Sequence, residues 1–513
     1  MGGAGIVNAD AAGGCPCAST PRQAGVISIS PGTGTPRGRQ PLSIPPLRPG
    51  MVARGRRVGG IAPGRDPLAG GGHGWGGGPG LSPCGNGPGG VTWSASTSLA
   101  SFARLTDFDC AFQNARWVVH RDSDGVVAAV YAARGATGAK GLSLHLLSPT
   151  TKTWSTIQFE PGSLPYARLF GLDTGGEELR NPSIATDGTD FYIAAERATN
   201  SNRRIVALRL QWARGRETWS LLGQTVREEY CGLPSVVWDT VGPRLRIAFH
   251  ANEPGAILRA NTNIYLWEID PTRPVSSRPE LVDAADGTPM LPRSKDMASL
   301  SASDGRLVLA WRTVQQGAAR GAPYKGVMAM TRGPLDRIPW ARMPRVTVAG
   351  APAENTNASD PCALALPDGR SLVGYWRNDL TSRFPEIRVS ERGSRTLSWT
   401  MSGALAPALS PTGVEYHLFA HLEHDDCRVI GVWEGRQDPL NDLTQNGAYV
   451  SGSVGSPRWA VPSDAGYFEV PGTGEVALAS SLFPGFCTGG GQLHLVWLDA
   501  ITLTLRYASG VIG

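Results

Sequence analysis

The sequence predicts an all-β protein: a seven-bladed β-propeller closed by an N-terminal strand and preceded by an extended Gly/Pro/Arg-rich arm. One strand-like segment recurs seven times, further strand-like segments fill each interval, and the composition changes near residue 90. The copies are 125–134, 188–197, 243–252, 305–313, 369–378, 427–435 and 491–499. They recur every 54 to 65 residues, and a near-constant interval of this size is typical of a repeat architecture.

Each interval holds three further segments that we expect to be strands. Directly after each copy comes a segment such as 204–212, where apolar and polar residues alternate as in a half-buried strand. The third segment is marked by Trp154, Trp219, Trp340, Trp399 or Trp459, and 280–282 takes its place in the third unit. The fourth precedes the next copy, as at 182–186 and 234–238. Four short strands per unit, without a convincing helical stretch, predict a propeller.

The seventh unit lacks its tryptophan strand after residues 502–509. A matching segment, GVTWSAST with Trp93, occurs at residues 90–97. We therefore expect residues 91–97 to complete the last blade of a propeller that spans 91–513. Pairing of these distant segments would close the ring and cover the exposed strand edges. The alternative is that Trp93 belongs to a linker.

Residues 1–90 have the composition of an arm rather than of a folded domain. They contain 26 Gly, 13 Pro and 8 Arg, no Lys, and only Asp10 and Asp66 as acids. Such a segment has too little apolar surface to form its own core. Its side chains carry a net charge of +6, against −1 for residues 91–513. We expect the arm to contact other protein subunits of an assembly through Arg37, Arg39, Arg48, Arg54, Arg56 and Arg57. The alternative is a solvated linker.

Several partner classes are not expected. The nearly neutral propeller lacks the basic footprint of a nucleic-acid-binding domain. No run of 18 apolar residues predicts a membrane span, and the first ten residues lack the basic and apolar regions of a secretory signal. Of the eight cysteines, we interpret those of the propeller as buried free thiols, with bonds between neighbouring blades as the alternative, and Cys15 and Cys17 as too isolated for a zinc site. The acidic and histidine-rich segment 421–426 is interpreted as a solvated turn, so neither a metal nor another cofactor is expected.

The loops that follow the repeated strands are expected to line one rim, where a rigid scaffold carries its functional residues. Guanidinium clusters suit carboxylate or phosphate recognition because they donate paired hydrogen bonds. A glycan is one such ligand, and the alternative is a set of solvated charges or ion pairs between blades. No catalytic residue is assigned, because no hydrolase, zinc-protease or phosphate-loop motif is present. The rim candidates for ligand binding are Arg134, Arg197, Arg312, Arg377, Glu434 and Asp499.

The segment NPSIATDGTDFYIAA, residues 181–195, resembles repeats of the sialidase-like (BNR-type) propeller superfamily, and the resemblance covers 91–513 in repeat style only. That family's hallmark is an Asp box, Ser-x-Asp-x-Gly-x-Thr-Trp, in the turn before the last strand of a blade. The matching turns here, SPTTKTW at 148–154 and RGRETW at 214–219, are degenerate. The resemblance implies three substrate-binding arginines, a Tyr nucleophile with a Glu partner, and an Asp acid/base. Only Arg180, before Asn-Pro, is similar to a family motif, Arg-Ile-Pro.

Three functions remain open at this point. The one that we favour from the sequence is a non-enzymatic binding component of a bacteriophage virion, such as a tail, fibre or head-decoration protein. Its arm would anchor it, and its rim would face a host glycan or protein. The second is a sialidase-like glycan-processing enzyme with arginines and acids converging in a central pocket. The third is a soluble cytoplasmic interaction scaffold.

Overall fold

In this computed structural model the described residues belong to one compact unit, Pro79–Gly513. The predicted arm and its six contact arginines lie outside the described residues. Within that described part, no helix is long and apolar enough to cross a membrane. The structure describes residues 91–512 except 111–114, 136–137, 172–175, 200–201, 214, 226–230, 253–261, 274–277, 284–294, 317–322, 334–335, 337, 351–356, 368, 379–382, 391–398, 402–414, 425–427, 437–444, 454–458, 461–480 and 500.

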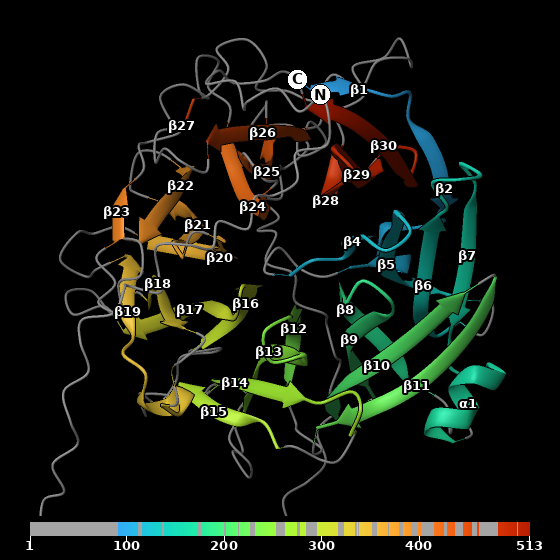
Figure 1. Ribbon diagram of the computed structural model, residues 1–513, viewed down its shortest axis with the longest axis horizontal. Coiled ribbons are helices and arrows are strands. Elements are labelled where there is room, and N and C mark those ends of the chain that lie inside the picture. Colours follow the sequence, from blue (N-terminus) through green and yellow to red (C-terminus); the bar gives the residue numbers. More distant parts are fainter. Residues whose placement is uncertain are drawn as a thin grey trace, which may run out of the picture. The chain divides into compact units, whose positions relative to one another are not determined.

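The described strands form seven antiparallel sheets, and in sheets 2 to 6, as numbered below, the strands pair in chain order (Figure 1). Sheet 1 contains β3 (Phe108–Asp109), β4 (Val118–Arg121), β5 (Val126–Arg134), β6 (Lys140–Leu147) and β7 (Trp154–Phe159). Sheet 2 contains β8 (Glu178–Thr186), β9 (Phe191–Ala198), β10 (Arg203–Ala213) and β11 (Arg216–Gln224). Sheet 3 contains β12 (Cys231–Asp239), β13 (Arg244–Asn252), β14 (Thr262–Ile269) and β15 (Glu280–Asp283).

The remaining sheets repeat this plan. Sheet 4 contains β16 (Lys295–Ser303), β17 (Arg306–Gln316), β18 (Pro323–Arg332) and β19 (Val346–Ala349). Sheet 5 contains β20 (Asn357–Ala365), β21 (Ser371–Asn378), β22 (Arg383–Ser390) and β23 (Trp399–Met401). Sheet 6 contains β24 (Glu415–His424), β25 (Arg428–Arg436), β26 (Gln445–Ser453) and β27 (Trp459–Ala460). Sheet 7 contains β28 (Ser481–Gly489), β29 (Gln492–Asp499), β30 (Thr504–Ile512), β1 (Val91–Trp93) and β2 (Thr97–Ser101). Antiparallel four-stranded sheets of this kind are the units of β-propellers.

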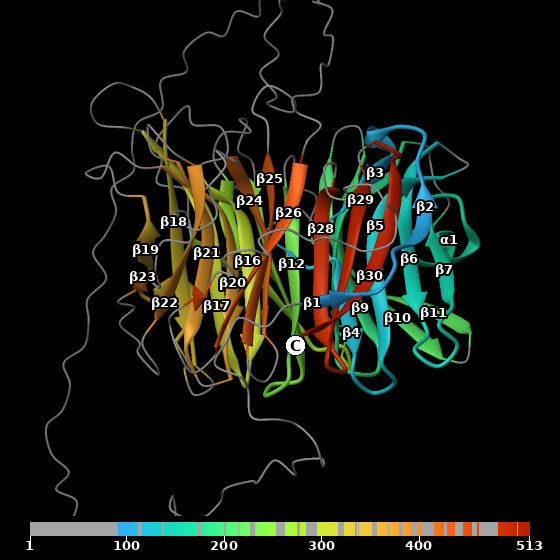
Figure 2. The same cartoon turned by 90° about the horizontal axis from the view of Figure 1, so that it is seen from above.

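Each of the seven repeated segments forms a strand, as the repeat predicts: it is β5 in sheet 1, the second strand in chain order in sheets 2 to 6, and β29 in sheet 7. The Gly that opens many copies has a conformational reason, because Gly125 and Gly188 have φ of 70° and 88°, which side chains disfavour. β5 is buried from Val126 to Ala132, since strands of its own sheet and side chains of the adjoining sheets enclose it. In Figure 2 the strands of sheets 1 and 7 run in the same general direction.

Sheet 7 joins residues from both ends of the described chain. β30 pairs with β29 on one side and with both β1 and β2 on the other. Trp93 lies opposite Gly510, and Ser94 N donates to Ser509 O at 2.7 Å. The predicted strand 91–97 is thus two short strands that extend to Ser101, which lie beside β30 in Figure 1.

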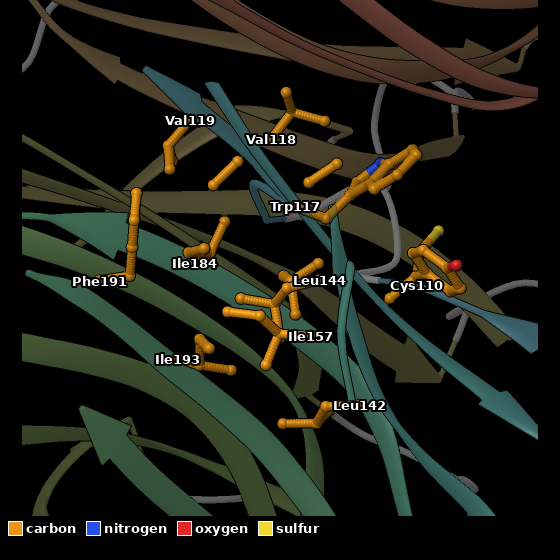
Figure 3. Packing of buried hydrophobic residues seen from close by; sticks show 14 of the residues in the cluster. Cys110, Trp117, Val118, Val119, Leu142, Leu144, Ile157, Ile184, Phe191 and Ile193 are labelled. Carbon is orange, nitrogen blue, oxygen red and sulfur yellow. The ribbon is translucent and has the colours of Figure 1, made fainter. Parts of the chain in front are cut away.

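The first full strands of successive sheets, β4, β8, β12, β16, β20, β24 and β28, contact one another in that order, and β28 contacts β4. We call them the innermost strands. Serine hydroxyls tie neighbouring sheets together: Leu300 N donates to Ser235 Oγ at 3.1 Å, and Ala363 N donates to Ser299 Oγ at 3.0 Å. In Figure 3, Trp117 and Val118 of sheet 1 and Ile184 and Phe191 of sheet 2 lie in the same apolar cluster.

Five innermost strands carry the same irregularity near their beginning. A non-glycine residue has φ between 46° and 53°, and the pairing register shifts there: Asn181, Leu233, Met297, Asp360 and Phe483. Such bulges redirect side chains and raise the local backbone energy by about 1 kcal/mol or more. Strain of this kind gathers at functional sites. This bulge end of the innermost strands is therefore a candidate location for a functional site.

Two sequence predictions about local structure are wrong. The helix α1 (Leu164–Phe170) forms where none was predicted, because Ser163 caps its first turn and Gly171, with φ of 84°, ends it. Trp340 lies in a 3₁₀ helix, η2 (Trp340–Arg342), and the strand β19 follows it. The other 3₁₀ helix of the described part, η1 (Leu105–Asp107), precedes β3.

Four cysteines can be assigned. Cys110, Cys231, Cys362 and Cys487 are buried free thiols, as predicted. The other four lie outside the described residues.

Candidate functional site

Six charged residues of sheets 1 and 2 gather at the bulge end. We call them the mouth cluster: Asp109, Lys140, Glu178, Arg180, Glu196 and Arg203. The strand β8 places Arg180 directly before the bulge residue Asn181, and the antiparallel register sets Arg180 opposite Glu196 of β9. β3 packs beside β8, which brings Asp109 of the first sheet to the same place.

Arg180 is the centre of this cluster. Its Nε and Nη2 donate to Glu178 Oε2 at 2.8 and 2.5 Å, and its charge also acts on Asp109 and Glu196. The Arg180 side chain keeps 37% of its surface exposed, whereas that of Glu178 keeps 18%. One guanidinium with three carboxylates around it therefore faces solvent, and the N–H groups that Glu178 does not occupy can donate to a ligand.

Glu196 is held in one position by two sheets. Its Oε1 accepts from Asn181 Nδ2 at 2.7 Å and from Leu233 N of sheet 3 at 2.8 Å. Arg203 Nη1 lies 3.6 Å from Oε2. A Cβ on Gly232 would collide with Oε1, so glycine is needed for the carboxylate to reach the next sheet. Since Glu196 is almost wholly buried, it orients the cluster rather than contacting a ligand.

Asp109 is the residue of the mouth cluster whose carboxyl has a raised pKa. Burial, with a smaller contribution from the charge of Glu196, raises the pKa of its carboxyl to about 6 against the opposing charges of Lys140 and Arg180. Lys140 Nζ lies 3.7 Å from Asp109 Oδ2. Protein atoms crowd the carboxyl, yet 21% of its side chain stays exposed, which leaves access for a ligand. Near pH 6, Asp109 can therefore give up or take a proton.

The rim candidates Arg134 and Arg197 make different contacts. Arg134 ends β5 and lies at the edge of the mouth cluster: its Nε donates to Asp107 at 3.2 Å, and its Nη1 is 3.9 Å from Glu178. Arg197 Nη2 donates to both oxygens of Glu177 at 2.7 and 2.8 Å, and its guanidinium lies 4.4 Å from the centre of the Phe170 ring. These contacts fix the α1 segment against sheet 2.

The other rim candidates lie in their own sheets. Arg312 donates to Asp296 from Nε and Nη2 at 2.6 and 2.5 Å and to Ser359 at 3.2 Å, which links sheets 4 and 5. Asp499 ends β29, where it accepts from Ile501 N and Thr502 N and pairs with Arg506. Arg377 and Glu434 lie in β21 and β25, and their side chains are outside the described part.

One pair resembles the Tyr–Glu nucleophile of sialidases in composition. Tyr166 Oη donates to Glu177 Oε2 at 2.5 Å, next to Arg197. The Tyr166 side chain is fully buried, and burial raises the pKa of its hydroxyl far above the ordinary value. A nucleophile must reach its substrate and must lose its proton easily. Tyr166 meets neither condition, so this pair is structural.

A cavity of about 140 Å³ lies between the opposite, C-terminal halves of the innermost strands. Arg116 and Glu423 cross it with an ion pair of 3.0 Å from Nε to Oε1, and Cys487 lines it. The expectation of a solvated turn at 421–426 is wrong for Glu423, which is a buried residue of β24. Among the described residues no group of three or more His, Cys, Asp or Glu could hold a metal ion.

The sequence singled out only part of the mouth cluster. Arg180 was marked by the Asn-Pro that follows it, and the bulge explains that signal. Asp109, Lys140, Glu178, Glu196 and Arg203 belong to no recognisable motif. The one available signal was a short motif in which the bulge residue is followed by Pro and then by Ser. It occurs at 181–183 and at 233–235, in two successive sheets.

No family model matches the chain, and no curated protein is significantly similar to it. Solved propellers resemble it. The α-L-arabinofuranosidase of Fusarium graminearum has 9% identity and a TM-score of 0.42, over 82% of this chain and 98% of that one. The α-L-arabinanase of Penicillium chrysogenum has 12% identity and a TM-score of 0.42 over the same shares. A Hadza microbial sialidase has 14% identity and a TM-score of 0.37, over 64% of this chain and 63% of that one. A sialidase is thus among the propellers that it resembles, and a likeness this distant does not extend to activity.

Proposed function

We propose that residues 91–513 form a closed seven-bladed propeller that binds and hydrolyses a glycan at the mouth cluster. The observation that carries the proposal is Asp109, a partly exposed carboxyl whose pKa is raised to about 6 beside a second carboxylate and exposed guanidinium groups. Most glycosidases use one carboxyl as a proton donor and another as base or nucleophile. A perturbed carboxyl in a ligand-accessible site is the usual mark of such a proton donor.

Each residue of the mouth cluster has a separate role in the proposed hydrolysis. Asp109 protonates the glycosidic oxygen as the bond to the sugar breaks. Glu178, held by two hydrogen bonds from Arg180, is the carboxylate that takes a proton from the water molecule whose oxygen bonds to the sugar carbon. Arg180 and Lys140 donate hydrogen bonds to sugar hydroxyls. Glu196 is the positioning residue, since it connects Asn181 and Leu233 and so fixes the bulge beside Asp109.

A closed propeller would support this assignment by its geometry. The innermost strands contact one another in sequence and β28 contacts β4, so their bulges face the same end. A closed ring would hold this end rigid while a ligand binds.

The virion role, the cytoplasmic alternative and the contact of residues 1–90 with partner subunits stay predictions, because they concern the predicted arm. No observation among the described residues favours them over the enzyme, so the glycan-processing function is the one we advance.

A panel of chromogenic glycosides tests the proposal. We expect the purified full chain to hydrolyse at least one substrate from a set that covers neutral and acidic sugars, α-L-arabinofuranosides and sialosides included. Glu217→Gln, an exposed carboxylate of β11, is the matched control and should keep wild-type activity. Absence of turnover across the panel, together with absence of glycan binding by isothermal titration, would remove the proposal and leave the virion role as the stronger alternative.

A further inference from the structure

Sheets 1 and 7 meet along a contact that is unusually rich in histidine. We call this contact the seam; it joins β4–β7 to β28–β30. His120, His145 and His494, three of the eight histidines of the chain, lie in it. The seam is also where strands from both ends of the described chain share sheet 7.

The rings of His120 and His494 stack across the seam. Their centres lie 5.8 Å apart and their planes are 10° from parallel. His494 Nδ1 lies 2.9 Å from Tyr507 Oη within sheet 7, and His120 Nδ1 lies 2.9 Å from Asp122 Oδ1 within sheet 1. A Cβ on Gly489 would overlap the His120 ring, so the close approach of the two sheets depends on glycine at this position.

A second aromatic link runs beside the first. Trp154 of β7 meets Tyr507 of β30 edge-on, with ring centres 4.9 Å apart, and His145 packs against Trp154 at 6.2 Å. His145 Nε2 lies 2.8 Å from Tyr131 Oη, and its Nδ1 lies 3.1 Å from Thr156 Oγ1. Both partners of this buried ring are neutral hydroxyls, so neither supplies a countercharge to an imidazolium.

These surroundings disfavour protonation. Burial lowers the pKa of His145 to about 4. Burial, and then the charge that His120 can carry, lowers the pKa of His494 to about 4. Lys152 acts in the same direction on His494, and a backbone hydrogen bond at Gly489 opposes it. Asp122, which pairs with His120, is largely exposed and is therefore a weak countercharge. Cys487 lies opposite His494 in the register, and burial raises the pKa of its thiol.

The sign of the effect follows from linkage. An unfolded histidine titrates near 6.5, above the folded value of His145 and His494. The stability that the neutral rings give is therefore present above about pH 6.5 and is lost as the pH falls towards about 4. Protonation of both stacked rings would also place two positive charges face to face.

We propose that the seam is an acid-sensitive latch: the stacked rings of His120 and His494, together with His145, keep sheets 1 and 7 joined, and acidification separates these two sheets while sheets 3 and 4 stay packed. This inference rests on the pairing at the seam and goes beyond the proposed glycan hydrolysis, so either can fail without the other.

Hydrogen–deuterium exchange of the wild-type chain at about pH 7.5 and about pH 4.5, corrected for the intrinsic pH dependence of exchange, tests the latch. We expect amides of β4 and β28–β30 to lose about tenfold or more protection at the lower pH, and those of sheets 3 and 4 to keep theirs. Loss of protection in all four sheets together would mean global acid unfolding and would overturn the proposal. Unchanged protection at the seam would overturn it as well.

A double variant, His145→Gln with His494→Gln, assigns the effect to the imidazoles. Glutamine keeps a hydrogen-bonding group near Tyr131 and Tyr507 but does not titrate. We expect the seam of this variant to lose much less protection at the lower pH than the seam of the wild type does. His250→Gln, at a buried histidine of β13 in sheet 3, is the control and should keep the wild-type response. If the double variant keeps the wild-type acid response, the latch is contradicted. If the double variant does not fold, the comparison of the seam with sheets 3 and 4 in the wild-type chain still tests the proposal.

Discussion

Replacing Gly485 by alanine is expected to lower the free energy of unfolding by about 2 to 3 kcal/mol, as overpacking of a tight interior site does. A Cβ at Gly485 in β28 would overlap the indole ring of Trp117, a buried residue of sheet 1. The ring is a poor candidate for relaxation because it packs inside the apolar cluster shared by sheets 1 and 2. Urea denaturation followed by circular dichroism measures the change.

Gly242→Ala is the matched control for this substitution. A Cβ there would have only ordinary contacts, 3.8 Å from Asp239 Oδ2, so we expect a change within about 0.5 kcal/mol. Equal stability of the two variants would show that β28 does not press against Trp117. In that case the first and last sheets would not meet as described, and the closed propeller would lose its support.

The second large effect concerns Asp109→Asn, for which we expect kcat/KM on the natural glycan to fall by about 100-fold or more. Asparagine keeps the size of the side chain but cannot supply a proton to the leaving oxygen. The loss should shrink for an aryl glycoside whose leaving group needs no protonation, since the general acid then contributes little. Steady-state kinetics with the two substrate types measures the difference.

Glu217→Gln should leave both rates unchanged, because Glu217 lies exposed on the outer strand β11. An equal loss on both substrate types in Asp109→Asn would argue for a structural or binding role of Asp109. A rate equal to that of the wild type would exclude Asp109 from the chemistry.

The repeated strands could be predicted from the sequence because each carries its own local signal. Seven apolar segments, most of which follow a glycine turn, all form strands, and Trp154 and Trp219 mark outer strands as expected. The prediction for Trp340 was wrong because Trp340 belongs to a 3₁₀ turn that precedes the strand. Its indole is buried there as it would be in a strand. The helix α1 was missed because it is short and its cap, Ser163, lies in a loop.

The mouth cluster could not be predicted in the same way, because its residues come together only through packing between sheets. Asp109 belongs to a two-residue strand of sheet 1, and Glu196, whose charge adds to the effect of burial on its pKa, lies on sheet 2. Glu196 reaches Leu233 only because Gly232 leaves room on a third sheet. In contrast, Arg197 and Arg312 were predicted as ligand-binding residues from a local pattern, a charged residue near the end of each repeated strand. In the structure both form ion pairs within the protein.

The pH dependence of kcat/KM for a hydrolysed glycoside tests the central claim, that Asp109 donates the proton, most directly. For the wild-type chain we expect kcat/KM to fall about tenfold per pH unit above about pH 6, since the carboxyl must be protonated to act and its pKa is about 6. The residual activity of Asp109→Asn should lack this alkaline limb. An alkaline limb at the same pH in both proteins would assign the proton to another group and contradict the account.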